Sequence, residues 1–201
     1  TGHKIIAMPT TDAKIRPEQI EEAVLFHCDE HMVKPKVVYI TDSTELGTIY
    51  SLKELLEIRE ICNRYGLYLY LDGARLASAL TAPGNDVTLE DLGRLTDAFY
   101  IGGTKNGMLF GEAIVILNER LKEDFRYLIK QKGGLLAKGR LLGVQFKAAF
   151  ETDLYFEMGR HANRMATLLR DGIRDLGYDF LVDSPTNQLF PVFPNELADK
   201  L

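Results

Sequence analysis

Short apolar runs alternate along the chain with longer segments in which apolar residues recur every three or four positions. The run at 67–71 is apolar at every position, which is typical of a parallel strand with both faces covered. By the same criterion of short, continuous apolar runs, we predict strands at residues 4–8, 37–40, 67–71, 98–101, 113–117 and 188–193.

Helical signals fill the intervals between these runs. Pro17 opens one predicted helix, because the missing N–H of proline costs nothing in a first turn. Ser51 begins another, and Glu54 three residues later completes a capping box. Gly66 ends that helix, since glycine readily adopts the left-handed conformation found there. Long helical patterns then occupy much of the stretch 119–176.

Alternating strands and helices predict an α/β fold with three layers, in which helices flank a mostly parallel sheet. In such a sheet, ligands collect beyond the carboxyl ends of the strands. Asp72 follows the strand at 67–71, and Lys105 follows the strand at 98–101. We therefore expect these two charged residues to face one crevice.

Composition and charge narrow the class of protein. The chain has 201 residues, 46% hydrophobic content and a net charge of −5, so it carries no basic field for nucleic acid. No uncharged apolar run approaches the roughly 18 residues that cross a bilayer, so no membrane segment is predicted. Cys28 and Cys62 are expected to be reduced, partly buried thiols of a cytoplasmic protein. His27 and His31 have the spacing of a helical metal pair but lack a third ligand, so a solvated helix end is the favoured interpretation and no metal site is predicted.

The residues around Lys105 permit covalent chemistry. It lies in the glycine-rich stretch GGTKNG, residues 102–107, where the backbone can approach a flat ligand closely. A partly desolvated lysine loses some of its preference for the charged form, and the neutral amine forms Schiff bases. The alternative interpretation is that Lys105 is an ordinary surface lysine in a turn.

The turn after the strand at 67–71 offers complementary groups. The Asp72 carboxylate would keep a ring nitrogen protonated, which is how pyridoxal phosphate becomes an electron sink. Ala74 offers a small apolar face for a ring, and Arg75 offers a planar fork for a carboxylate or phenolate oxygen. The alternative is that Asp72 only begins a turn.

The stretch LYLDGARLASAL, followed further on by DAFYIGGTKNG, resembles the threonine aldolase and β-eliminating lyase family, whose members are pyridoxal-phosphate enzymes of the aspartate-aminotransferase fold. The resemblance implies that Lys105 binds the cofactor covalently and that Asp72 pairs with its pyridine nitrogen. It further implies that Arg75 binds the ring oxygen or the substrate carboxylate and that Thr104 contacts the phosphate. The fold it implies is the large domain of that class.

The segment KGGLLAKGR, residues 132–140, has a role in the same resemblance. In the family this region approaches the cofactor of the neighbouring subunit, so Lys138 or Arg140 would reach a phosphate across a dimer interface. The other interpretation is a plain turn at a helix entry. The resemblance implies a homodimer or homotetramer.

The resemblance also sets expectations about domains. Residues 1–150 are expected to form part of a large cofactor-binding domain. Residues 151–201 are expected to form a connecting long helix and the start of a small C-terminal domain. We expect the chain to be a fragment that lacks the N-terminal segment of the family and most of its C-terminal domain.

The activity implied is cleavage of a β-hydroxy amino acid such as threonine to glycine and an aldehyde. Two departures bear on the substrate: Asn106 stands between the lysine and Gly107, and ITDSTELGT at 40–48 replaces the segment with Asn and His that is usual in the family. The alternatives are another pyridoxal-phosphate reaction, either β-elimination or transamination, or a non-catalytic α/β module that binds a ligand.

Overall fold

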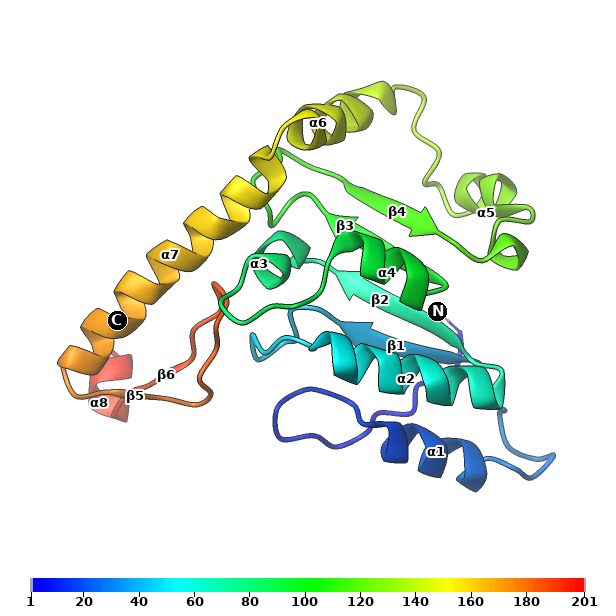
Figure 1. Cartoon of the computed structure of the whole chain (residues 1–201), viewed down its shortest axis with the longest axis horizontal. Helices are drawn as coiled ribbons and strands as arrows, with labels where there is room; N and C mark the ends of the chain where they lie inside the picture. Colours follow the sequence, from blue (N-terminus) through cyan, green and yellow to red (C-terminus); the bar gives the residue numbers. More distant parts are fainter. Residues whose placement is uncertain (1, 201) are drawn as a thin grey trace.

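The computed structural model describes residues 2–200, which are built around a four-stranded sheet (Figure 1). Its strands are β1 (Val37–Thr41), β2 (Tyr68–Gly73), β3 (Ala98–Gly102) and β4 (Glu112–Ile116), in that spatial order. The first three are parallel, whereas β4 runs antiparallel to β3. The short loop between β3 and β4 explains this reversal, since a parallel neighbour needs a crossover of a dozen or more residues. The predicted mostly parallel sheet flanked by helices is confirmed.

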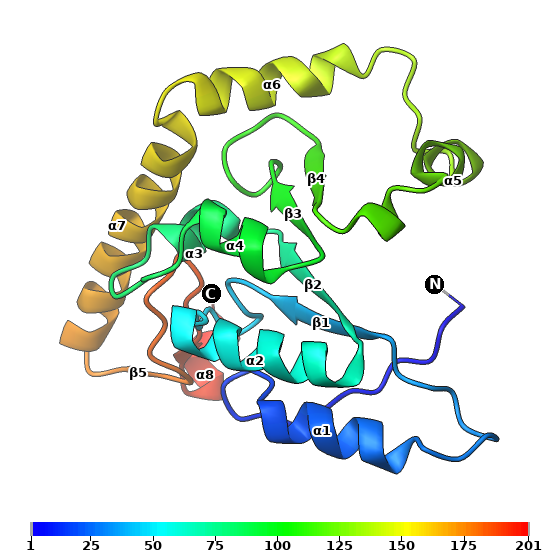
Figure 2. The ribbon, with the colours of Figure 1, turned by 45° about the vertical axis from the view of Figure 1, so that its right-hand side comes forward.

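Helices cover one face of this sheet. α2 (Leu52–Tyr65) and α4 (Leu89–Leu95) lie side by side over it, and α1 (Pro17–Phe26) lies beside α2 (Figures 1 and 2). Alternate residues of β2, Leu69 and Leu71, are fully buried in the core. Tyr68, Tyr70 and Asp72, which alternate with them, are half-buried, so the sheet has a covered face and a more open one.

The local signals in α2 are confirmed. The Ser51 side chain accepts a hydrogen bond from the backbone N–H of Glu54 at 3.3 Å, and the Glu54 carboxylate accepts one from the backbone N–H of Ser51 at 2.8 Å. Gly66 ends the helix with a φ of +63°. Both ends of this helix are therefore specified by neighbouring residues.

The remaining elements do not belong to the main sheet. α3 (Leu76–Leu80) follows β2 and packs against α7 (Leu154–Asp175), the long helix that runs along one side of the molecule (Figure 2). The remaining elements are η1 (Glu119–Leu121), α5 (Phe125–Gln131), α6 (Arg140–Glu151), β5 (Asp179–Phe180), β6 (Pro191–Val192) and α8 (Asn195–Ala198). β5 and β6 pair antiparallel, apart from the main sheet.

Two predicted strands differ from the structure. Residues 4–8 form no strand, because no strand of residues 2–200 pairs with them, and Ile5 is 81% exposed. The run at 188–193 is a strand only at Pro191 and Val192. An apolar run becomes a strand only where a partner supplies the backbone hydrogen bonds.

The predicted pair of histidines on one helix does not form. α1 ends at Phe26, His27 is the residue that caps it, and His31 lies beyond. The His27 ring lies 2.8 Å from the carbonyl oxygen of Ala23 and 3.0 Å from the Lys4 ammonium, and it is buried. The same helix end leaves Cys28 exposed, contrary to prediction, whereas Cys62 is buried. Among the helices described, none is long and apolar enough to cross a membrane.

Candidate active site

Asp72 lies near the carboxyl end of β2, between the two strands that flank it. Its register partners are Thr41 of β1 and Tyr100 of β3. The carboxylate accepts a hydrogen bond from the Tyr39 hydroxyl and one from the backbone N–H of Ala74 at 3.0 Å. The Tyr100 hydroxyl also hydrogen-bonds to it. Three donors from β1, β3 and the following turn therefore hold the carboxylate in place.

The two tyrosines remain donors at neutral pH. Burial raises the pKa of both the Tyr39 and the Tyr100 phenol, and the bond to the Asp72 carboxylate raises each pKa further. Sequence reasoning missed both residues. The signal that could have found them is strand alternation, because Tyr39, Asp72 and Tyr100 lie on the same face once the three strands are aligned.

The turn after β2 carries the next predicted residues. Ala74 is half-buried, and Arg75 is the residue that precedes the first turn of α3. The Arg75 guanidinium is half-exposed and makes no ion pair or hydrogen bond with any side chain of residues 2–200. The Arg75 cation, which has no counter-charge among residues 2–200, is therefore available to an anionic ligand.

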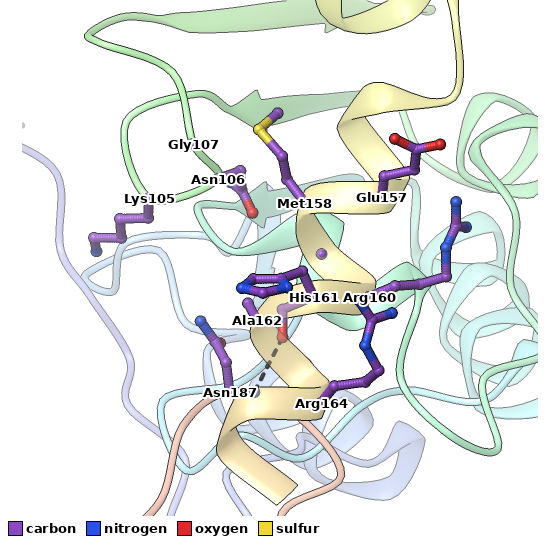
Figure 3. A pocket seen from close by; sticks show the side chains of 12 residues that line it. Lys105, Asn106, Gly107, Glu157, Met158, Arg160, His161, Ala162, Arg164 and Asn187 are labelled. Carbon is purple, nitrogen blue, oxygen red and sulfur yellow. Dashed lines mark hydrogen bonds between the residues drawn. The ribbon is translucent and has the colours of Figure 1, made fainter. Parts of the chain in front are cut away.

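Lys105 lies in the loop that follows β3. It is exposed, as is Thr104, so the expected partial burial of the lysine is not seen within the described chain. Its ammonium has no partner among residues 2–200. Lys105 lines a half-open cavity of about 570 Å³, together with residues of α7, and Figure 3 shows it extending away from the α7 side chains. Asp72 does not line this cavity.

The loop between β3 and β4 that carries Lys105, residues 103–111, is called the lysine loop below, and the turn between Asp72 and the start of α3 is called the Asp72 turn. The two are directly attached to each other. Asn106 is buried, and its amide donates hydrogen bonds to the carbonyl oxygens of Ala74 at 3.0 Å and Gly102 at 2.8 Å. A side chain at Gly102 would overlap the Ala74 carbonyl group, so only glycine permits this approach. The structure therefore brings Asp72, Ala74, Arg75, Thr104 and Lys105 to the same end of two adjacent parallel strands.

Arg140 lies apart from this group. It is exposed at the first position of α6, and Figure 1 shows that this end of α6 lies beyond β4, away from the carboxyl ends of β2 and β3. Within one copy of the chain, the structure does not bring Arg140 to the other predicted residues.

The fold places the chain in the class of aspartate-aminotransferase-like proteins. A Thermus thermophilus aspartate aminotransferase variant superposes with a TM-score of 0.62 at 16% identity, over 86% of this chain and 44% of that one. The profile of the β-eliminating lyase family matches residues 1–194, and the chain belongs to that family.

Two relatives define the comparison more closely. A low specificity L-threonine aldolase of Pseudomonas aeruginosa is 36% identical over 190 residues, which are 94% of this chain and 55% of that protein. A solved threonine aldolase of Leishmania major superposes with a TM-score of 0.97 at 51% identity, covering 99% of this chain and 58% of that one. The chain therefore spans a little over half the length of each.

Members of the threonine aldolase and β-eliminating lyase family are pyridoxal-phosphate enzymes. The residues present fit that cofactor. A carboxylate held by three donors lies near the end of one strand, an amine without a counter-charge among residues 2–200 follows the next strand, and Ala74 is the small residue beside the carboxylate. Such a set matches a flat ring that carries a basic nitrogen, an aldehyde and a negative charge.

Proposed function

We propose that the protein to which this chain belongs is a pyridoxal-phosphate-dependent lyase that cleaves a β-hydroxy amino acid, such as threonine, to glycine and an aldehyde. The observation that carries the proposal is the Asp72 carboxylate, fixed by Tyr39, Tyr100 and Ala74, at the end of the strand adjacent to the one that leads to Lys105. The similarity to a low specificity L-threonine aldolase supports this substrate class.

Each residue has a distinct task in this proposal. Lys105 attaches the cofactor through its amine, and Asp72 holds a proton on the ring nitrogen. When bound, the cofactor supplies an electron sink for the charge left on Cα as the bond to Cβ breaks. Ala74 contacts the ring, and Thr104 contacts the phosphate. Arg75 binds the ring oxygen or the substrate carboxylate, for which it has no competing carboxylate in residues 2–200.

A second candidate reaction uses the same residues. The family to which the chain belongs is described by β-elimination, and that reaction also leaves a negative charge on Cα. The products separate the two reactions, because aldol cleavage yields glycine and an aldehyde, whereas β-elimination yields ammonia and a keto acid. Transamination would yield a keto acid without releasing ammonia.

The direct test is chemical labelling of the full-length protein. After incubation with pyridoxal phosphate and reduction with borohydride, peptide mapping is expected to find the modified residue at Lys105. Lys53, an exposed lysine on α2, serves as the control position and is expected to stay unmodified. Modification elsewhere, or none at all, would favour the non-catalytic module.

We further propose that the protein assembles as a homodimer or homotetramer. The support is a set of exposed apolar side chains on α5 and α6, which flank the segment 132–140. They are Tyr127, Leu128, Leu141 and Val144. Arg140, at the start of α6, would then reach a cofactor phosphate held by a second copy. Sedimentation of the full-length protein as a monomer at micromolar concentration would contradict this proposal.

We also propose that the chain divides into two domains and that the protein is cytoplasmic. The separate pairing of β5 and β6, beyond the long helix α7, supports a division into residues 1–150 and 151–201. The two free cysteines support a cytoplasmic location, where thiols stay reduced. Limited proteolysis tests the domain division, which predicts cleavage near residue 152. Localisation of the full-length protein tests the cytoplasmic location.

A further inference from the structure

We infer that Asn106 is a positioning residue, which fixes the backbone of Lys105 relative to the turn that carries Asp72 and Ala74. This inference rests on the proposed function, because it concerns how an attached cofactor is oriented. In the sequence, Asn106 is only an extra residue between the lysine and Gly107. In the structure it is the residue of segment 103–107 whose side chain bonds to the Asp72 turn.

The amide of Asn106 uses its donors and its acceptor at once. Its nitrogen donates to the carbonyl oxygens of Gly102 at 2.8 Å and Ala74 at 3.0 Å. Its oxygen accepts a hydrogen bond from the backbone N–H of Ala77 at 3.3 Å. The residue is 6% exposed, so water does not replace these partners readily.

These partners belong to three separate pieces of structure. Gly102 is the last residue of β3, Ala74 belongs to the turn after β2, and Ala77 lies in the first turn of α3. N–H groups in a first helical turn lack partners within the helix, so Asn106 satisfies one of them. One side chain therefore links the lysine loop to the turn that follows Asp72.

A second residue supports this junction from outside the loop. The hydroxyl of Tyr155, fully buried on α7, donates to the Gly102 carbonyl at 3.2 Å. Tyr155 does not belong to the loop, so it stabilises the end of β3 without constraining the residues after Gly103. Within the loop, the Gly103 carbonyl accepts backbone hydrogen bonds from Asn106 and Met108, and the Gly103 N–H donates to the Glu112 carboxylate at 2.7 Å. These bonds shape the loop and join it to β4, whereas the Asn106 side chain joins it to the turn that follows Asp72.

The direction of the two neighbouring side chains explains why this constraint matters for the amine. Figure 3 shows Lys105 extending outward from the loop, whereas Asn106 points in the opposite direction, into the protein. An inward anchor one residue away restricts the positions available to the Lys105 backbone. A cofactor held at both Asp72 and Lys105 needs that spacing before it binds, since ordering the loop afterwards costs affinity.

The chain offers a matched control. Asn163 on α7 is 5% exposed, and its amide also makes three bonds. It donates to the carbonyl oxygen of Ser78 at 2.9 Å and the Thr81 hydroxyl at 3.2 Å, and it accepts from the Ser78 hydroxyl at 2.5 Å. Asn163→Ala therefore removes a similar buried amide from the junction of α3 and α7, without touching the lysine loop.

The first measurement needs no cofactor. Amide hydrogen exchange of the full-length protein is expected to become about fivefold faster in segments 74–77 and 103–108 of Asn106→Ala, the factor for one lost hydrogen bond. Asn163→Ala is expected to raise exchange in α3 and α7 but not in 103–108. Equal exchange of the lysine loop in the two variants would overturn the inference.

The second measurement uses pyridoxal phosphate. In Asn106→Ala, the dissociation constant of the cofactor is expected to rise about tenfold, while Asn163→Ala stays near wild type. The visible circular dichroism of the bound cofactor, relative to its absorbance, is expected to fall only in the Asn106 variant, because its orientation is no longer fixed. An unchanged dissociation constant and dichroism in Asn106→Ala would overturn the inference.

A third variant keeps the test valid if Asn106→Ala fails to fold. Asn106→Asp has the same shape, and its acid form retains one donor, but its ionised form places an anion against two carbonyl oxygens. Its dichroism relative to wild type is therefore expected to fall as pH rises. A flat pH profile would count against the inference.

If borohydride labels no lysine in the wild type, the proposed function fails, whereas the exchange experiment still reports on Asn106.

Discussion

The two faces of the sheet show opposite uses of the same strands. On the covered face, Leu69 and Leu71 are fully buried beneath α2 and α4. On the open face, Tyr39 is 57% exposed and its ring stacks on that of Tyr70 at 5.5 Å, while its hydroxyl bonds to Asp72. Neighbouring residues of one strand therefore serve a hydrophobic core on one side and a polar cluster on the other.

The difference follows from the two-residue period of a strand. Burial of apolar area is non-directional, so the covered face needs only side chains of suitable volume. The polar cluster depends on donors and acceptors at hydrogen-bond distance, and each comes from a different strand. We therefore expect substitutions on the covered face to change stability and substitutions on the open face and its loops to change chemistry.

The largest effect is expected at Lys105. Lys105→Ala should remove covalent attachment of pyridoxal phosphate and reduce glycine production below detection, because no other amine has the same position. The unfolding temperature should not change, since Lys105 is exposed and has no partner in residues 2–200. Borohydride labelling and thermal unfolding measure the two effects, and Lys53→Ala is the control. Glycine production at the wild-type rate would refute the role of Lys105.

A substitution on the covered face should instead lower the stability of the protein. Leu71→Ala removes a fully buried side chain and is expected to lower the free energy of unfolding by about 2–5 kcal/mol. The adjacent Tyr70→Phe, on the open face, is expected to change it by less than about 0.5 kcal/mol. Denaturant titration measures both values, and equal losses would show that the faces do not differ in this way.

The covered side also contains a buried acid, Asp42, directly after β1. It is 1% exposed, and its Oδ1 atom has no hydrogen-bond partner among the described residues. Burial raises the pKa of this carboxyl from 3.8 to about 7, although a bond from the Tyr50 backbone and the charge of Lys14 lower it, and the charge of Glu54 raises it. The folded state therefore retains a proton that the unfolded chain has already released.

This shift fixes the direction of a pH effect. Because the pKa is higher in the folded state, the contribution of Asp42 to stability is complete at low pH and is lost as pH rises toward 7. Between pH 5 and 7 the loss should be about 2 kcal/mol. Asn at position 42 does not titrate, so denaturant titrations of Asp42→Asn should lack this part of the slope. The same slope in both proteins would contradict the assignment.

Local signals explain what the sequence could predict. The helix at Leu52–Tyr65 carries both of its end signals within the segment, and continuous apolar runs mark β1, β2 and β3. The predicted strand at 4–8 failed because an apolar run does not reveal whether a neighbour will pair with it. Fold class and the Asp72 and Lys105 motifs were thus accessible without coordinates.

The polar contacts of the site were not accessible in the same way. The bond from Tyr39 to Asp72 joins residues 33 positions apart, and that from Asn106 to Ala74 joins residues 32 apart. Their existence depends on which strands are adjacent and in which register, and no local pattern encodes this. Asn106 therefore looked like a departure from a motif, whereas the structure shows a buried link.

The smallest predicted effect tests the open face directly. Tyr100→Phe removes one of the three donors to Asp72 but keeps the ring and its packing. Hydrogen bonds to a charged group contribute about 1.5–3 kcal/mol, and partial solvent exposure of Asp72 reduces this to roughly 1 kcal/mol. The kcat/KM for glycine production by the full-length protein should therefore fall about fivefold.

The control for this prediction is Tyr70→Phe, which removes a hydroxyl from the same face without removing a donor to Asp72. It should leave kcat/KM unchanged. Because the Tyr100 hydroxyl acts on the carboxylate and not on the core, the free energy of unfolding should stay within about 0.5 kcal/mol in both variants. A Tyr100→Phe protein that loses stability but keeps its kcat/KM would reverse the comparison, since this residue of the open face would then act as part of the core.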